Sequence, residues 1–164
     1  MSVEIIVTGV KEFQDFIDRY TRELPNKMEE FAYNLANEGI PVIDTNMQTA
    51  AGDSSSAHYC WVEIQNNGST IKSTLWVEGT DLAFIEFGAG IYYNNQDQPK
   101  ASEFGVGIGT YGKGQGLNYG WYYYDDTGTR QFSHGTEMTM PVLKASQKME
   151  RVFFEVALKT FGDK

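Results

Sequence analysis

The N-terminal part of the chain carries helical patterns of hydrophobic residues. From residue 11 onward, apolar side chains recur three and four positions apart, which places them on one side of a helix. The members of this stripe are Phe13, Phe16, Ile17, Tyr20 and Leu24. A second pattern follows Pro25 and continues to Met47. Because proline lacks the amide hydrogen that a helix interior uses, Pro41 predicts a bend or break near Gly39. A short run of β type at residues 3–7 precedes both patterns.

A β-hairpin is predicted around the dipeptide Asn67-Gly68, which favours a two-residue type I′ turn. Such a turn pairs Asn66 with Ser69 and, further out, Glu63 with Lys72. One face of the hairpin is then mostly apolar and suited to a core; it carries Cys60, Val62, Ile64, Ile71, Ser73 and Leu75. The other face is mixed. A slip of one residue would exchange the two faces, so the register is testable.

The rest of the chain predicts further short elements and one long helix. Residues 82–87 fit either a third strand or a short helical turn, and residues 121–124 and 129–132 fit strands joined by a turn. Residues 88–120 form a glycine-rich excursion, of which 94–118 is expected to be a mobile loop. Pro141 suits the first position of a C-terminal helix. We therefore expect an α+β fold: a single domain over 1–164, with a small, mostly antiparallel sheet between an N-terminal helical region and a C-terminal helix.

Composition narrows the classes of function. The chain has 164 residues, with 13 Lys and Arg against 22 Asp and Glu, giving a net charge of −9. This acidic balance opposes general DNA binding, which depends on clustered Lys and Arg. Apolar runs fall far short of the roughly 20 residues of a membrane span, and the first residues do not match a secretion signal. With one cysteine, no internal disulfide is possible.

Few residues suggest catalysis or metal binding. His58 and Cys60 are two positions apart, so on a strand they share a face, and His134 is the only other histidine. A Cys/His nucleophile pair needs an orienting group and an oxyanion site, which the sequence does not indicate. We expect ordinary packing for Cys60 and exposure at a loop edge for His58. Glu86 lies between Ile85 and Phe87 without a second carboxylate or base beside it in the sequence. No catalytic residue, cofactor or metal is expected.

The glycine-rich excursion contains a phosphate-binding pattern. Gly107 to Gly112 satisfies G-x-G-x-x-G, and Lys113 extends it to G-x-x-x-x-G-K. These motifs cradle phosphate only between a strand and a helix. Here Gly114 occupies the position that needs Ser or Thr, and Gln115 and Gly116 follow it, so we interpret the match as chance. A nucleotide-binding protein that uses this loop is kept as an alternative.

Aromatic and basic residues offer two further interpretations. Trp121 and the tyrosines at 122–124 could form a sugar-stacking platform, and a carbohydrate-binding module is the second alternative. Alternation along a strand sends these side chains to both faces, which favours use in the core and at a subunit interface. The basic stripe from Lys144 to Lys159 is interpreted as a solvated helix face.

The segment at 81–90, DLAFIEFGAG, carries a family resemblance. Residues 84–88 follow the order aromatic, hydrophobic, Glu, aromatic, Gly. This order resembles a motif of the head-tail joining or tail-completion proteins of long-tailed bacteriophages. The stretch from Gly135 through Pro141 to Ala145 resembles the same family's passage into its C-terminal helix. The order of elements along the chain is also similar.

This resemblance implies a non-enzymatic structural protein of the virion, made in the bacterial host cytoplasm. It implies a ring, generally sixfold, at the head-tail junction or tail terminus. The implied partners are other copies of the chain, a connector and the tail tube, with DNA only passing through the lumen and no membrane. The residues that the resemblance suggests for the subunit or partner interface are Glu86, Phe87, Gly88, Tyr92 and Tyr93.

Overall fold

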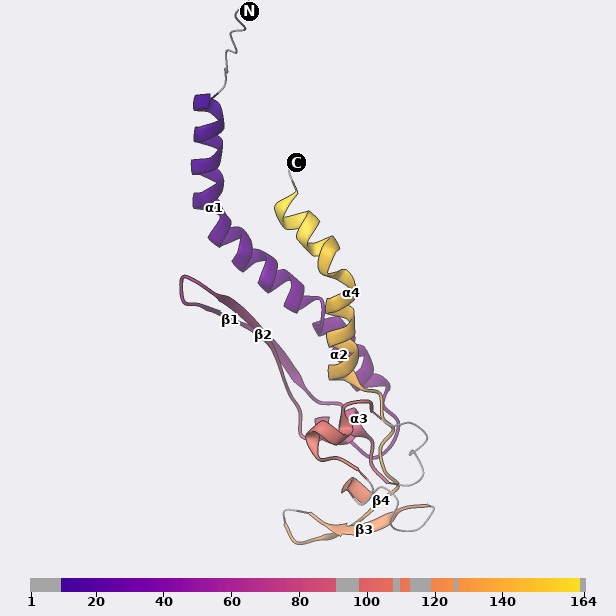
Figure 1. Cartoon of the computed structure of the whole chain (residues 1–164). Coiled ribbons are helices and arrows are strands. Elements are labelled where there is room, and N and C mark those ends of the chain that lie inside the picture. The colour runs from indigo at the N-terminus through magenta and orange to yellow at the C-terminus, as the bar shows by residue number, and fades with distance from the viewer. Residues whose placement is uncertain (1–9, 91–97, 108–109, 113–118, 126, 163–164) are drawn as a thin grey trace, which may run out of the picture.

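The computed structural model of the chain describes residues 10–90, 98–107, 110–112, 119–125 and 127–162. The fold is α+β, as predicted, with two long helical regions and two small antiparallel sheets (Figure 1). In order the elements are α1 (Val10–Asn37), α2 (Ile40–Thr49), β1 (Tyr59–Asn66), β2 (Ile71–Glu78), α3 (Leu82–Phe87), the 3₁₀ helices η1 (Ala101–Phe104) and η2 (Thr110–Gly112), β3 (Trp121–Tyr124), β4 (Arg130–Ser133) and α4 (Pro141–Phe161). The strand expected at 3–7 lies outside the described residues.

The N-terminal helical region is interrupted near Gly39, where Pro41 predicts a bend or break. The Gly39 carbonyl accepts the first hydrogen bonds of α2, from the amides of Val42 and Ile43 at 3.1 Å each. The two patterns that flank Pro25 form one helix, α1, which bends along its length (Figure 1). A proline inside a helix removes one backbone hydrogen bond and commonly bends the helix without ending it.

The first hairpin has the predicted faces but a different register. Asn66 pairs with Ile71, not with Ser69, and Glu63 pairs with Thr74, not with Lys72. The turn is displaced by one residue because the Asn67 side-chain oxygen accepts the amide of Thr70 at 2.8 Å, while the Asn67 amide donates to the Thr70 carbonyl. Each β1 residue is therefore paired with a β2 residue two positions further along than predicted. Because side chains alternate with a period of two, each residue keeps its predicted face.

The other predicted strands form a separate sheet. β3 and β4 pair antiparallel, with Trp121 opposite Ser133, and they hydrogen-bond to each other and not to β1 and β2. The single small sheet that we expected is thus two two-stranded sheets. Residues 82–87, left open between strand and helix, form the short helix α3. Both hairpins are small, so most of their stability must come from what they pack against.

The buried core is small and lies where α2, α3 and α4 meet. Its centre is a cluster of Ile43, Met47, Ile85 and Ala145, each at most 1% exposed. Leu75 and Val77 of β2 pack against this cluster from the apolar face of the hairpin. Away from it, Phe31 of α1 packs edge-on against Phe153 of α4, with ring centroids 5.2 Å apart.

None of the helices in the described ranges is both long enough and apolar enough to cross a membrane.

Candidate functional site

The first part of α1 carries exposed apolar side chains that no other element described in the structure encloses. Phe13, Phe16 and Ile17, here called the α1 stripe, are 64%, 42% and 39% exposed. All side chains from residue 11 to 19 are exposed, although they belong to a regular helix. An isolated helix of this length is marginal in water, since helices in proteins are stabilised mainly by packing of their apolar face. The α1 stripe is therefore a surface suited to another chain.

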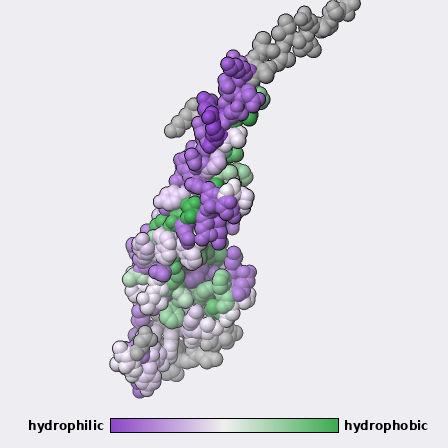
Figure 2. Space-filling view, turned by 90° about the vertical axis from the view of Figure 1, so that its left-hand side faces the viewer, coloured by the Kyte–Doolittle hydropathy of each residue, from purple (hydrophilic) through white to green (hydrophobic). Residues whose placement is uncertain are grey.

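The end of α4 repeats this feature. Phe154 and Leu158 lie one helical turn apart and are 78% and 73% exposed. Together with the α1 stripe they belong to sixteen large hydrophobic side chains that are exposed among the described residues, against ten hydrophobic residues that are buried. On the face shown in Figure 2, hydrophobic residues gather over the middle of the elongated molecule. Contiguous exposed apolar surface is typical of protein interfaces.

A row of stacked aromatic rings covers the outer face of the first hairpin. Trp61 stacks on Tyr59 and on Trp76, with centroid distances of 5.5 Å and 6.0 Å. The Trp76 indole N–H donates to Glu63 at 2.9 Å. Hydrogen bonds from the side chains of Gln65, which has the larger effect, and of Trp76 lower the pKa of Glu63. The row does not follow from the predicted register, which places Trp61 opposite Thr74, whereas the observed register places Trp61 directly opposite Trp76.

In the second hairpin, one aromatic side chain packs against the fold and others are exposed. Trp121 is half-buried against the backbone of Gly90 and Gly112. Tyr122 and Tyr124 are 60% and 71% exposed. The Arg130 guanidinium lies 3.9 Å from the centre of the Tyr122 ring, a cation–π arrangement. This hairpin lies at the opposite end of the molecule from the start of α1 (Figure 1).

The residues that the resemblance suggests for the interface have different environments. Glu86 and Gly88 are buried, and Phe87 is half-buried with its ring centroid 5.6 Å from that of Phe104. Tyr92 and Tyr93 lie outside the described residues. Contact of this segment with a partner stays a prediction.

Glu86 holds the start of α4. The Val142 amide donates to Glu86 Oε2 at 2.7 Å, and the Leu143 amide donates to Oε1 at 3.2 Å. The Gln98 side-chain amide, itself buried, also donates to Oε1 at 3.0 Å. The first amides of a helix lack partners within the helix, and a carboxylate suits the positive end of the helix dipole. Met140, at the N-cap position, supplies no side-chain cap, so a residue of α3 takes that role.

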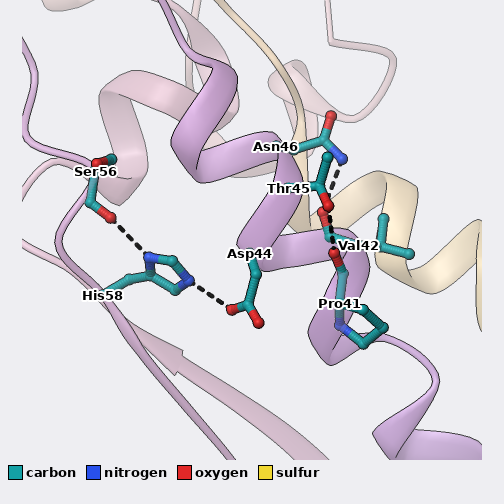
Figure 3. A network of polar contacts seen from close by, with 7 residues as sticks. All are labelled: Pro41, Val42, Asp44, Thr45, Asn46, Ser56 and His58. Carbon is teal, nitrogen blue, oxygen red and sulfur yellow. Dashed lines mark hydrogen bonds and ion pairs between the residues drawn. The ribbon is translucent and has the colours of Figure 1, made fainter.

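A second polar centre connects α2 to the start of β1 (Figure 3). His58 Nε2 lies 2.7 Å from Asp44 Oδ1, and His58 Nδ1 lies 2.7 Å from the Ser56 carbonyl oxygen. Our expectation that His58 is exposed at a loop edge is wrong, because its side chain is only 9% exposed. The physical reason is that both ring nitrogens have acceptors within the fold, which Asp44 and Ser56 supply from outside the strand.

The same centre contains Cys60, half-buried on β1. Among the described residues, Asp44, His58 and Cys60 are the one group of three metal-ligating side chains whose ligand atoms all lie within 4.8 Å of one another. Burial and the negative charge of Asp44 raise the pKa of Cys60, and the Ser56 carbonyl and Asp44 raise the pKa of His58. A raised thiol pKa is the opposite of what an activated cysteine nucleophile requires.

The surroundings of the phosphate-binding pattern are only partly described. Gly107 is exposed, and Thr110–Gly112 form the 3₁₀ turn η2, in which Tyr111 has a positive φ of 50°. Residues 108, 109 and 113–118 lie outside the described residues. The element described before the pattern is η1, a 3₁₀ helix, where a phosphate-binding loop would follow a strand.

The glycine-rich excursion also packs against the fold in part. Gln98 and Val106 are buried, at 4% and 7% exposure. The mobility expected for 94–118 in the free protein stays a prediction.

The basic stripe of α4 makes specific contacts. Lys144 Nζ lies 2.8 Å from Asn46 Oδ1, and Lys148 pairs with Glu38 at 3.4 Å. Lys159 pairs with Glu155 one turn away at 2.7 Å. Two of the three lysines therefore connect α4 to the N-terminal helical region, which a purely solvated face would not do.

In comparisons with family models, curated proteins and solved structures, no match to this chain was found. Function is therefore inferred from the sequence and geometry of the chain itself.

Proposed function

We propose that the protein is a structural subunit of a phage or prophage virion that assembles into a ring at the head-tail junction or tail terminus. The observation that carries this proposal is the α1 stripe: Phe13, Phe16 and Ile17 are exposed on a regular helix, and within the described ranges no other element encloses them. A second subunit would supply that cover. The resemblance of residues 84–88 to the joining and completion proteins names the kind of assembly.

The positions of the exposed surfaces support head-to-tail assembly, which a ring requires. In a ring, each subunit uses two different patches, one toward each neighbour. The start of α1 and the β3–β4 hairpin with its exposed tyrosines lie at opposite ends of the elongated molecule (Figure 1). Contacts with a connector and a tail tube can then use other exposed apolar residues, such as Phe154 and Leu158 near the end of α4.

The stacked aromatic row favours assembly over sugar binding. Sugars stack on the free faces of aromatic rings, but in the row Trp61 already stacks on both Tyr59 and Trp76, at interplanar angles of 24° and 15°. The Trp61 ring is therefore already engaged with two neighbouring rings. Tyr59 and Trp76 remain 65% and 46% exposed, and exposed aromatic residues of this kind are enriched at protein interfaces.

A deletion of the gene in its phage or prophage tests the proposal. We expect DNA-filled heads and separate tails in electron micrographs, restored to complete virions by the wild-type gene supplied in trans. The variant Phe13→Ser, Phe16→Ser, Ile17→Ser should not restore them, because truncating an interface anchor typically costs about 2 kcal/mol or more.

A matched control changes the opposite side of the same helix. The variant Asp15→Ser, Asp18→Ser, Arg22→Ser removes polar side chains that lie away from the α1 stripe and should restore virions. Normal virions after gene deletion would refute the virion role. Restoration by the α1 stripe variant would leave that role intact and refute the α1 stripe as the contact surface.

A further inference from the structure

The centre that contains Asp44, His58 and Cys60 offers a metal ion three different donors. Asp44 comes from α2, and His58 and Cys60 come from the beginning of the chain segment that forms β1. Their ligand atoms, a carboxylate oxygen, an imidazole nitrogen and a sulfur, lie within 4.8 Å of one another. They are thus close enough to be reached by one ion.

The spacing suits a zinc-class cation after a small adjustment. Zinc binds nitrogen and oxygen at about 2.0–2.1 Å and sulfur at about 2.3 Å, which in a tetrahedron separates the ligand atoms by roughly 3.3–3.6 Å. His58 Nε2 and Asp44 Oδ1 are 2.7 Å apart as a hydrogen-bonded pair. An ion that replaces this hydrogen bond needs them to separate by less than an ångström. Asp44 is 47% exposed and can make that movement.

The environment of His58 is the one that a metal-binding histidine requires. Its Nδ1 faces the Ser56 carbonyl oxygen at 2.7 Å (Figure 3). Metal-binding histidines commonly donate the N–H of one ring nitrogen to a carbonyl, which fixes the ring and leaves the other nitrogen for the metal. Here the other nitrogen, Nε2, faces Asp44. The ring is therefore held in a binding orientation before any ion arrives.

We propose that Asp44, His58 and Cys60 form a binding site for a zinc-class divalent cation, with water completing the coordination. The site goes beyond the proposed assembly role and departs from the sequence-based expectation of ordinary packing at Cys60. Bound metal connects α2 to the start of β1, two segments that border the small core. Because the ion binds the folded chain, it stabilises the subunit by an amount that grows with the logarithm of the ion concentration relative to its Kd.

The chain contains an internal control for this site. His134 and Asp53 form a second histidine–aspartate pair, with His134 Nδ1 3.4 Å from Asp53 Oδ2. Their side chains are 62% and 44% exposed, and within the described ranges no third metal-ligating group completes a cluster around them. Substitution of His134 thus removes a histidine without touching the proposed site.

Titration of the full-length, reduced protein with Co²⁺, after removal of metal with a chelator, tests the proposal. We expect one equivalent to bind, with a near-ultraviolet thiolate-to-cobalt absorption band that Zn²⁺ abolishes by competition. Cys60→Ser should lose the band, and His58→Gln and Asp44→Asn should each weaken Co²⁺ binding at least about tenfold. His134→Gln should bind like the wild type. The circular dichroism spectrum checks that each variant is folded.

Thermal unfolding gives a second measurement that does not depend on cobalt spectra. Zn²⁺ should raise the Tm of the wild type and of His134→Gln, and should not raise that of Cys60→Ser. Absence of a thiolate band in the folded wild type overturns the proposal. So does wild-type affinity in both His58→Gln and Asp44→Asn, which would assign the metal to the cysteine alone.

Discussion

Two stretches of the N-terminal helical region differ in what covers their apolar residues. In α2, Ile43 and Met47 are at most 1% exposed, enclosed by α3, α4 and the first hairpin. In the first part of α1, Phe13 and Phe16 are 64% and 42% exposed. Both stretches show helical spacing of hydrophobic residues, so the same pattern serves a core in one place and a surface in the other. Periodicity predicts which side of a helix is apolar, but not whether the partner belongs to the same chain.

The largest expected loss of stability comes from a substitution in the buried part of α2. Met47→Ala removes a fully buried side chain from the core and should lower the free energy of unfolding by about 2–5 kcal/mol, through lost burial and the cavity left behind. Met28→Ala is the matched change on α1, where the side chain is 43% exposed. It should cost no more than about 0.5 kcal/mol. Denaturant unfolding measures both, and equal losses would contradict the division between core and surface.

A smaller effect is expected where a polar group, not an apolar one, supports the core. Glu86→Gln replaces one acceptor oxygen with a donor, so that an amide of the first α4 turn or Gln98 loses its partner. The expected cost is about 1–3 kcal/mol, because a buried group left unsatisfied loses its hydration without compensation.

Glu150→Gln changes an exposed carboxylate on α4 itself and controls for the general effect of charge removal. It should be close to neutral in the same denaturant assay. A Glu86→Gln variant as stable as Glu150→Gln would show that the α4 amides do not depend on this carboxylate.

The smallest effect concerns the peripheral β3–β4 hairpin. Hydrogen bonds from the Thr127 hydroxyl, from Gln131 and from the Thr129 amide lower the pKa of Asp125 to about 2, from an ordinary value of 3.8. A lowered pKa in the folded state gives stability that is present above pH 3.8 and is lost as the pH falls through about 2. The amide NMR signals of Thr127 and Thr129, which donate to this carboxylate, should therefore titrate near pH 2.

Asp125→Asn should abolish that titration, while Asp15→Asn on the exposed part of α1 should leave it unchanged. A midpoint near 4 in the wild type would mean that the turn does not hold the carboxylate as described. The core should show no change over this range that depends on Asp125, since the hairpin is remote from the Ile43 and Met47 cluster.

Local patterns predicted much of the fold. The break at Gly39, the start of α4 at Pro141 and the two faces of the first hairpin all follow from backbone chemistry or from the alternation of side chains. The register of the hairpin did not, because the type of turn depends on the Asn67 side chain and its bond to Thr70, which competes with the standard Asn-Gly turn. The two turns differ little in free energy, and the pattern of hydrophobic residues is the same for both.

The polar centres could not be predicted because their partners are distant in the sequence. Glu86 meets amides 56 and 57 residues away, and His58 meets Asp44 from a different element. His58 and Cys60 are close in the sequence, but the third group of this centre, Asp44, comes from α2. Sequence alone supplies the donors; only the fold decides which of them meet.

The dependence of α4 on Glu86 bears on the order in which the chain folds. A helix that carries its own cap can begin to form as an isolated segment, whereas the first turn of α4 needs a carboxylate from far upstream. Closing so long a loop costs entropy before any contact compensates for it. We therefore expect the first turn of α4 to form only when α3 docks against it. The start of this helix thus depends on a tertiary contact, although its backbone has ordinary helical geometry.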